Sequence, residues 1–353
     1  MPKKNKILEL NDEQQAAVNV REGHYAVLSG PGSGKTAVLV ARFNALISSG
    51  ECHADIISLT FTKAAAREMQ SRANVNTTMI VGERPFGFRT FHSIALDFSV
   101  RERDAFPFPL AAFPLATGGQ VWKFTGEVAR RYAGMDVKQL LSYISLQKRN
   151  GVWPQEAVDA AQDIRDRTFA LAYKEYEERC RKLGVLDFDD LLLYMVEILE
   201  NYPDVRKRWA YKWVQIDEAG DADLTQWKLV QLLSKKHGNV FAVGDFRQVI
   251  YQWRGAEPKL FKEFHAMFPN CTFIYLNNNY RSTKAITEFC QAISPDKDDA
   301  AILRTENEQG EPVEIKGFAS NLLEARWVVE RIKEIENLER VPLLAQNQKS
   351  LAV

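Results

Sequence analysis

The chain has 353 residues, and its 46 Lys and Arg balance 46 Asp and Glu, so the formal net charge is zero. A hydrophobic fraction of 46% with 26% charged residues is typical of globular proteins and excludes a disordered or collagen-like chain. The length predicts two or three domains of roughly 150 residues each. Because the net charge gives no overall attraction to polyanions, a nucleic-acid site would have to be a local patch.

The amino-terminal segment carries Lys3, Lys4 and Lys6, with no apolar stretch behind them. This cluster reads as a solvated tail, with weak attraction to phosphate as the alternative. No apolar run approaches the roughly 18 residues that a membrane helix needs. We therefore expect a cytoplasmic protein with no membrane partner. Four well-separated cysteines are expected to be reduced thiols: Cys52, Cys180, Cys271 and Cys290.

The first 93 residues predict part of a parallel α/β sheet. Short apolar runs at 25–28 and 56–59 are typical of buried strands, and each is followed by a helical pattern, at 36–46 and 64–69. Strands that alternate with helices in this way favour a parallel sheet.

A mainly helical insertion is predicted over residues 94–205. The proline-rich run at 106–109 cannot lie inside a helix and marks a loop. Helical periodicity follows, best seen on one face made of Phe169, Ala172, Tyr173, Tyr176, Cys180 and Leu183.

The strand–helix alternation then resumes, which predicts a first α/β lobe made of residues 1–93 and 206–277. Its further strands are expected at the apolar runs 213–216, 239–243 and 271–276. Residues 278–353 predict part of a second α/β lobe that contains a strand at 341–345. Before that strand, a helix is expected with an apolar stripe of Leu322, Ala325, Val328, Val329, Ile332 and Ile335.

A glycine-rich turn between the first strand and its helix predicts a phosphate site. Backbone N–H groups in such a loop, and the helix N-terminus behind it, bind anions. Lys35 would reach the β- and γ-phosphates, and Thr36 would hold Mg²⁺ through its hydroxyl. A flexible glycine turn is the alternative reading, and Ser29 stands where the general pattern has glycine. The residues of the predicted site are Gly30, Pro31, Gly32, Ser33, Gly34, Lys35 and Thr36.

The apolar run at 213–216 ends in two carboxylates, Asp217 and Glu218. Asp217 can hold Mg²⁺, and Glu218 can orient and deprotonate an attacking water, which is most of what phosphoryl transfer to water requires. Alone, the pair would read as a solvated acidic turn. Beside a phosphate loop, it indicates a nucleoside triphosphatase.

Several further motifs follow in a fixed order and span about three quarters of the chain, at 10–14, 60–69, 90–93, 217–221, 243–256 and 279–282. With these motifs the chain resembles the UvrD/Rep family of superfamily 1 DNA helicases. The resemblance implies a P-loop RecA-like parallel-sheet lobe with an inserted helical subdomain and a partial second RecA-like lobe.

The resemblance implies how ATP and Mg²⁺ are held. Gln14 would read the adenine edge, and Tyr280 would stack on the adenine. Arg281 would reach the γ-phosphate from the second lobe as an arginine finger. Gln248 would couple the γ-phosphate to the DNA platform. The residues expected to take part in hydrolysis are therefore Lys35, Asp217, Glu218, Gln248 and Arg281, with Thr36 and Asp217 as metal ligands.

The resemblance also implies contacts to single-stranded DNA or to a junction of single and double strands. Aromatic side chains stack on bases, each worth about 1–3 kcal/mol and insensitive to sequence. Without the resemblance, Tyr251 and Trp253 read as core packing and His92 as a hydrogen-bonded core histidine. The residues expected on DNA are Phe61, Thr62, Thr90, His92, Tyr251, Trp253 and Arg254.

The run at 186–190 gathers three acidic residues. A metal nuclease is one reading of it. A helix start, with Asp187 as N-cap and further acids in the first turn, explains it more simply. No P-D-x-E-x-K-like cluster supports a nuclease.

Two functions stay open. The resemblance implies a DNA-dependent ATPase and 3′–5′ DNA helicase. The family's last two motifs do not occur in this sequence, so the alternative is a truncated or split ATP- and DNA-binding module that needs a second polypeptide for activity. Gly220 replaces the glutamine of the family's D-E-A-Q-D motif and is expected to weaken coupling between the two ligands.

Overall fold

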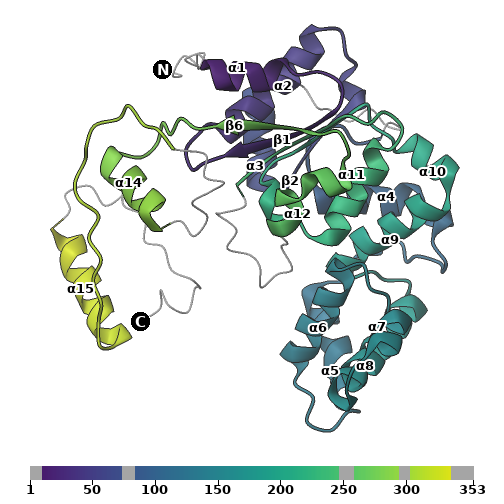
Figure 1. Ribbon diagram of the computed structural model, residues 1–353. Helices are drawn as coiled ribbons and strands as arrows, with labels where there is room; N and C mark the ends of the chain where they lie inside the picture. The colour runs from purple at the N-terminus through teal and green to yellow at the C-terminus, as the bar shows by residue number, and fades with distance from the viewer. Residues whose placement is uncertain (1–9, 74–83, 246–257, 294–302, 335–353) are drawn as a thin grey trace.

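The computed structural model describes residues 10–73, 84–245, 258–293 and 303–334. At its centre lies a six-stranded sheet of order β3-β2-β4-β5-β1-β6, and every pairing in it is parallel (Figure 1). The predicted α/β fold with a parallel sheet is thereby confirmed. The strands are β1 (His24–Ser29), β2 (Ile56–Thr60), β3 (Gly87–Thr90), β4 (Trp213–Ile216), β5 (Val240–Gly244) and β6 (Thr272–Leu276).

The inner strands β2, β4 and β5 are buried along their whole length. Helices cover both faces of the sheet, which is why these strands are continuous apolar runs rather than alternating ones. In the middle of the sheet, Val27 is in register with Val243 on one side and Ile274 on the other. Because all strands are parallel, the segments that follow them emerge at one edge of the sheet.

Two apolar cores lie on the two faces of the sheet. One includes Val38, Phe43 and Met69 and is covered by α1 (Asp12–Asn19), α2 (Lys35–Ser48) and α3 (Lys63–Ala73). The other includes Phe98 and Trp227 and is covered by α4 (Phe91–Arg101), α9 (Phe188–Asn201) and α11 (Leu224–Ser234), with α10 (Pro203–Arg208), α12 (Pro258–Lys262) and α13 (Phe264–Met267) beside it. The sheet is therefore the middle layer of three.

Only the middle of the predicted insertion forms a separate helical body below the sheet, whereas α4, α9 and α10, which also fall largely within residues 94–205, pack on the sheet (Figure 1). On α8, the expected apolar face is buried at Tyr173, Tyr176 and Cys180, whereas Leu183 is 50% exposed. Leu183 is the last residue of α8, where the helix gives way to a left-handed cap at Gly184. The helices of this body are α5 (Gly118–Ala129), α6 (Val137–Arg149), α7 (Pro154–Ala160) and α8 (Ile164–Leu183), with a core of their own.

After β6, the chain leaves the sheet and forms α14 (Lys284–Ile293) and α15 (Asn321–Lys333), which lie to one side (Figure 1). The predicted stripe lies on α15 from Leu322 to Ile332, but none of these residues is buried. Ile335, its last predicted member, lies outside the described residues. The strand expected at 341–345 lies outside the described residues. The boundaries of the three predicted domains stay predictions.

Three 3₁₀ turns complete the described elements: η1 (His53–Asp55), η2 (Arg103–Ala105) and η3 (Ala219–Asp221). All four cysteines are free thiols, as predicted. Within the described ranges, no helix combines the length and apolar character needed to cross a membrane.

Candidate nucleotide and nucleic-acid site

The chain turns sharply between the end of β1 and the start of α2. Gly32 and Gly34 have φ angles of +68° and +85°, a left-handed backbone that glycine adopts without strain. The Ser33 hydroxyl donates to the Gly30 carbonyl at 2.8 Å and closes the loop. Gly34 is the N-cap of α2 and has no side chain, so the first N–H groups of the helix stay available to an anion. The residues predicted at 30–36 thus form one compact turn at a helix N-terminus.

The two predicted carboxylates follow β4 at the same edge of the sheet. The Asp217 N–H donates to the Leu59 carbonyl at 2.9 Å and extends the strand ladder to the acid pair. Lys35 Nζ lies 3.8 Å from Glu218 Oε2. Asp217 is 4% exposed, and its Oδ1 has no hydrogen-bond partner among the described residues. Burial, followed by the Glu218 carboxylate, raises the pKa of Asp217 to about 7 against the opposing charge of Lys35.

This donor set fits a magnesium ion that is shared with phosphate. In the part of the chain that is described, no group of three or more His, Cys, Asp or Glu could hold a metal by itself. Mg²⁺ usually binds through one or two carboxylates together with waters and substrate phosphates. Asp217 offers an unpaired buried oxygen, and Thr36 is the second residue of α2 beside the phosphate loop.

Helix α1 lies against the phosphate loop through Gln14, which is 5% exposed. The Gln14 Nε2 donates to the Ser33 carbonyl at 2.9 Å. The other end of the same amide, Oε1, accepts the N–H of Asn11 at 3.1 Å in the capping box that begins α1. Both ends of the Gln14 amide are therefore held in place.

The segment after β6 contacts the loop from the opposite side. The Tyr280 N–H donates to the Gly32 carbonyl at 3.0 Å, and the Tyr280 hydroxyl accepts a hydrogen bond from the Asn11 side chain. The Arg281 N–H donates to Asn279 Oδ1 at 2.8 Å. The structure thus brings Gln14, Tyr280 and Arg281 to the phosphate loop, as a shared nucleotide site requires.

The segments that follow β2, β3 and β4 meet at a cavity of about 380 Å³. Four residues predicted on DNA line it: Phe61, Thr62, Thr90 and His92. The facing wall comes from the insertion and from α9, through Leu115, Arg149, Phe188 and Leu191. Asp221 and Asp223, just beyond the acid pair, also line the cavity.

His92 and Phe188 form a stack in this cavity, with ring centroids 3.7 Å apart and an interplanar angle of 13°. Phe188 remains 54% exposed. Burial, and then the nearby Arg149 charge, lowers the pKa of His92 to about 3, so this ring is neutral at physiological pH. His92 Nε2 is buried and has no hydrogen-bond partner among the described residues. The pair presents a neutral aromatic surface rather than a cationic one.

Thr90 has a local structural task as the N-cap of α4. Its hydroxyl oxygen accepts the Ser93 N–H at 3.1 Å, and the Ser93 hydroxyl oxygen accepts the Thr90 N–H at 3.1 Å. This capping box starts α4 directly after β3. The same turn holds His92 at the cavity.

The acidic run at 186–190 is a helix start, as the simpler reading predicted. The Asp187 side chain accepts the N–H of Asp190, and the Asp190 side chain accepts the N–H of Asp187, each at 2.9 Å. The sequence reading missed Phe188, which it treated only as part of this capping run. An apolar aromatic ring between two acids in a first helical turn is the signal that could have revealed it.

Four predicted residues, Gln248, Tyr251, Trp253 and Arg254, lie outside the described residues. The strand that leads toward them ends at Gly244. A Cβ at Gly244 would lie 2.9 Å from the backbone N of Ala219 and 2.9 Å from that of Gly220. The end of β5 therefore contacts the segment that joins the acid pair to the cavity.

A parallel sheet with a phosphate loop at the end of one strand and an acid pair at the end of another defines a P-loop nucleotide-binding protein. The UvrD/REP helicase N-terminal domain family matches residues 10–269, and the UvrD-like helicase C-terminal domain family matches residues 274–352. The chain belongs to the UvrD/REP helicase family.

Curated relatives align along most of the chain. The ATP-dependent DNA helicase PcrA of Bacillus subtilis (strain 168) is 30% identical over 338 residues, which is 93% of this chain and 45% of PcrA. The ATP-dependent DNA helicase Rep of Escherichia coli (strain K12) is 35% identical over 321 residues, 89% of this chain and 47% of Rep. DNA helicase II of the same organism is 32% identical over 334 residues, 92% of this chain and 46% of that protein. The chain thus spans a little under half the length of these relatives.

Proposed function

We propose that this chain binds ATP with Mg²⁺ at the phosphate loop, binds single-stranded DNA in the 380 Å³ cavity, and hydrolyses ATP in response to the DNA. Membership of the UvrD/REP helicase family supports this proposal, as do relatives described as ATP-dependent DNA helicases. The relatives are about twice as long as this chain. We therefore propose translocation and unwinding only for a complete motor that contains this chain.

One observation carries the proposal: a single short segment takes part in both sites. At its start, Asp217 and Glu218 lie beside Lys35 at the phosphate loop. At its end, Asp221 and Asp223 line the cavity. A displacement of this segment would be felt by both ligands, which is the arrangement that a DNA-dependent ATPase needs.

For hydrolysis we assign each residue a role that matches its position. Lys35 would bind the β- and γ-phosphates, and Glu218 would orient and deprotonate the attacking water. Asp217 and Thr36 would hold Mg²⁺, which when bound neutralises charge that develops on the phosphates. Arg281, whose backbone is held at the loop through the 279–281 segment, would stabilise the transferring phosphoryl group.

For nucleic acid, the stacked His92 and Phe188 rings offer a surface against which a base can pack, and Phe61 lines the same cavity. Neutral rings favour sequence-independent stacking over phosphate binding. Gln248, Tyr251, Trp253 and Arg254 stay proposed members of the coupling and DNA sites.

The decisive experiment is ATP hydrolysis with and without an oligothymidylate, with Lys35→Ala as the blank. We expect turnover that the oligonucleotide stimulates and that Lys35→Ala abolishes. Tight oligonucleotide binding with no turnover in the native chain would overturn the assignment of an ATPase.

Oligonucleotide binding without turnover is the outcome that a split ATP- and DNA-binding module would give. One observation supports this alternative. Apolar side chains of α14 and α15 are exposed at Ile286, Ile293, Leu322, Leu323 and Val329. A second polypeptide that completes the second lobe would cover them. If turnover appears only when the remaining half of a relative is supplied in trans, the chain is one part of a split motor.

The polarity that we propose is 3′ to 5′. A partial duplex with a 3′ single-stranded tail should be unwound by the complete motor, and the same duplex with a 5′ tail should not. Equal unwinding of the two substrates would contradict this polarity.

A further inference from the structure

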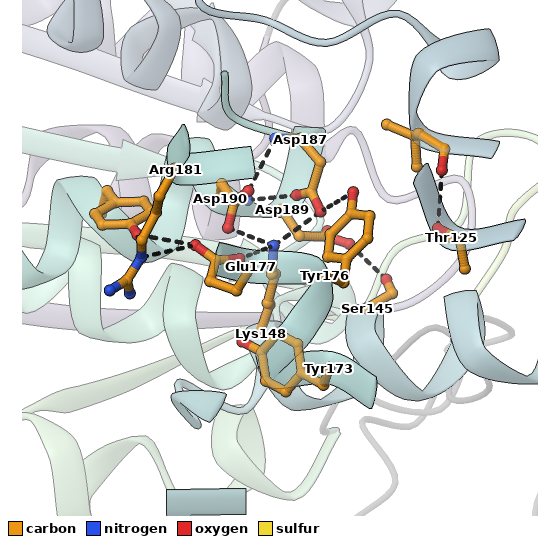
Figure 2. A network of polar contacts seen from close by, with 12 residues as sticks. Thr125, Ser145, Lys148, Tyr173, Tyr176, Glu177, Arg181, Asp187, Asp189 and Asp190 are labelled. Carbon is orange, nitrogen blue, oxygen red and sulfur yellow. Dashed lines mark hydrogen bonds and ion pairs between the residues drawn. The ribbon is translucent and has the colours of Figure 1, made fainter. Parts of the chain in front are cut away.

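A buried ion cluster joins the end of α6 to α8 and to the start of α9, and its polar contacts are drawn in Figure 2. The Lys148 side chain, at the end of α6, is 0% exposed. Its Nζ lies 3.0 Å from Glu177 Oε2 on α8 and 2.8 Å from Asp187 Oδ2 at the start of α9, and it also contacts Asp190 Oδ1. One cation thus serves three carboxylates from two other helices.

Aromatic hydroxyls complete the cluster. The Tyr176 hydroxyl donates to Asp187 Oδ2 at 3.0 Å, and the Tyr194 hydroxyl donates to Glu177 Oε1 at 2.8 Å. A buried ion pair adds little stability over apolar packing, because desolvation offsets the attraction between the charges. What such a cluster does supply is a defined geometry, since Asp187, Asp190 and Glu177 can share the Lys148 ammonium only when their helices are packed in one arrangement.

The neighbours of the cluster residues in the sequence line the cavity that we assign to DNA. Arg149 directly follows Lys148, and Phe188 directly follows Asp187; both line the cavity. Arg149 Nε also lies 3.1 Å from Asp189 Oδ1. The buried cluster and the Arg149–Asp189 ion pair therefore both join α6 to α9. The cluster lies beneath the cavity wall, and the ion pair lies at its surface.

A second tether connects this junction to α11. The Thr225 hydroxyl lies 2.9 Å from the Lys148 carbonyl and 2.9 Å from the Arg149 carbonyl and donates to both. Thr225 lies two residues after Asp223, another residue of the cavity wall. The end of α6 is therefore bonded to the starts of α9 and α11, and all three of these segments line the cavity.

We propose that Lys148 is a positioning residue for the nucleic-acid cavity: without touching DNA, it holds the start of α9 so that Phe188 stacks on His92. This inference rests on the proposed function of the cavity. A positioning role differs from a general role in stability, because replacing Lys148 should then weaken DNA binding and leave nucleotide binding unchanged.

The test compares two affinities in Lys148→Met, a variant that keeps the length of the side chain and removes its charge. Fluorescence anisotropy of a labelled oligothymidylate reports DNA binding, and a fluorescent ATP analogue with Mg²⁺ reports nucleotide binding. We expect the Kd for the oligonucleotide to rise at least about fivefold, the equivalent of the weakest lost base stack, with the Kd for nucleotide within twofold of the native value.

A local fluorescent reporter separates positioning from stability. An oligonucleotide with one 2-aminopurine is quenched when that base stacks on an aromatic ring. We expect quenching in the native chain and weaker quenching in Lys148→Met at saturating protein. The matched control is Leu140→Ala, which removes a fully buried side chain of the same helix, away from the cluster.

Lys148→Met removes the only lysine that the described residues place among three buried acids, of which Glu177 alone keeps a second cation there, Arg181, at 3.6 Å. A milder pair of variants therefore guards against misfolding. Tyr176→Phe removes a hydroxyl that bonds Asp187, whereas Tyr173→Phe removes a hydroxyl of the same helix that bonds the Val152 carbonyl at 3.2 Å. We expect weaker oligonucleotide binding in Tyr176→Phe and native binding in Tyr173→Phe.

The outcomes are distinguishable. If the native chain does not bind the oligonucleotide, the proposed function of the cavity fails. If the native chain binds it and Lys148→Met changes both affinities together, or only as much as Leu140→Ala does, the proposed function stands and the positioning role is wrong. Where Lys148→Met does not fold, equal binding by Tyr176→Phe and Tyr173→Phe overturns the positioning role.

Discussion

The side-chain amide of Gln14 donates to the Ser33 carbonyl at 2.9 Å, so helix α1 is attached directly to the phosphate loop. Gln14→Ala should weaken nucleotide binding about fivefold, the equivalent of one net hydrogen bond of about 1 kcal/mol. The Kd of a fluorescent ATP analogue measures this effect. Gln15→Ala is the control, because Gln15 bonds Asn19 on the exposed side of the same helix. Equal weakening in both variants would contradict a role for the loop contact.

Gly32 lies where the segment after β6 meets the phosphate loop. A Cβ at Gly32 would lie 2.6 Å from the Arg281 Cβ and 2.7 Å from Asn279 Oδ1, with φ at +68°. Gly32→Ala should therefore lower the ATP hydrolysis rate by displacing Arg281. Gly50→Ala is the matched control, since φ is +94° there and nothing lies within 4 Å of the added Cβ. Thermal unfolding of both variants separates backbone strain, expected in each, from loss of hydrolysis, expected only in Gly32→Ala.

The pKa of His92 is lowered to about 3, so its ring is neutral, and the contact with DNA that we propose for it is stacking rather than charge. His92→Phe should keep DNA affinity within about twofold, whereas His92→Ala should lose about fivefold or more, the equivalent of one stack. Anisotropy titrations at constant ionic strength measure both. A large loss in His92→Phe would show that an imidazole nitrogen, not the ring face, makes the contact.

Asp223 gives the stability of the protein a pH dependence. Burial raises the pKa of Asp223 to about 7, so the folded chain keeps a proton that the unfolded chain has released between about pH 4 and 7. This contribution to stability is present at low pH and is lost as the pH rises through that window. Asp223→Asn keeps the N-cap of α11 and cannot ionise, so its free energy of unfolding should fall less between pH 5 and 8 than that of the native chain.

Urea unfolding at several pH values measures this difference. Asp163→Asn is the control, because Asp163 is also an N-cap, that of α8, but is exposed to solvent. A pH slope in Asp223→Asn as steep as in the native chain would contradict the assignment of the proton to Asp223.

Motif spacing was enough to expect that the residues proposed to bind nucleotide lie together, because they follow the ends of strands in one sheet. The loop after β1 and the acids after β4 must emerge at one edge once the sheet is parallel. The four-residue strand β3 was not predicted, since Gly87 and Arg89 interrupt any apolar pattern within it. A strand of this kind forms because β2 offers a free edge.

Lys148 could not be recognised from the sequence. A lysine in the last turn of an amphipathic helix reads as a solvated residue that favours the helix dipole. Its burial depends on Glu177 and Asp187, which are brought to it only when α6, α8 and α9 pack together. Phe188 differs from Lys148, because its position between two acids in a first helical turn was a signal in the sequence. Only its stacking partner, His92 on another element, could not be foreseen.

The position of β6 at the edge of the sheet limits how far Arg281 can travel. Among the described strands, β6 pairs only with β1, and the carbonyl of its last residue, Leu276, accepts the N–H of Gly30 at 3.5 Å. The five residues from there to Arg281 reach about 17 Å when fully extended. Arg281 is thus tethered near the 30–36 loop at a high effective concentration. A larger displacement of Arg281 would require β6 to separate from β1, so this one strand pairing sets how far the proposed arginine finger can move.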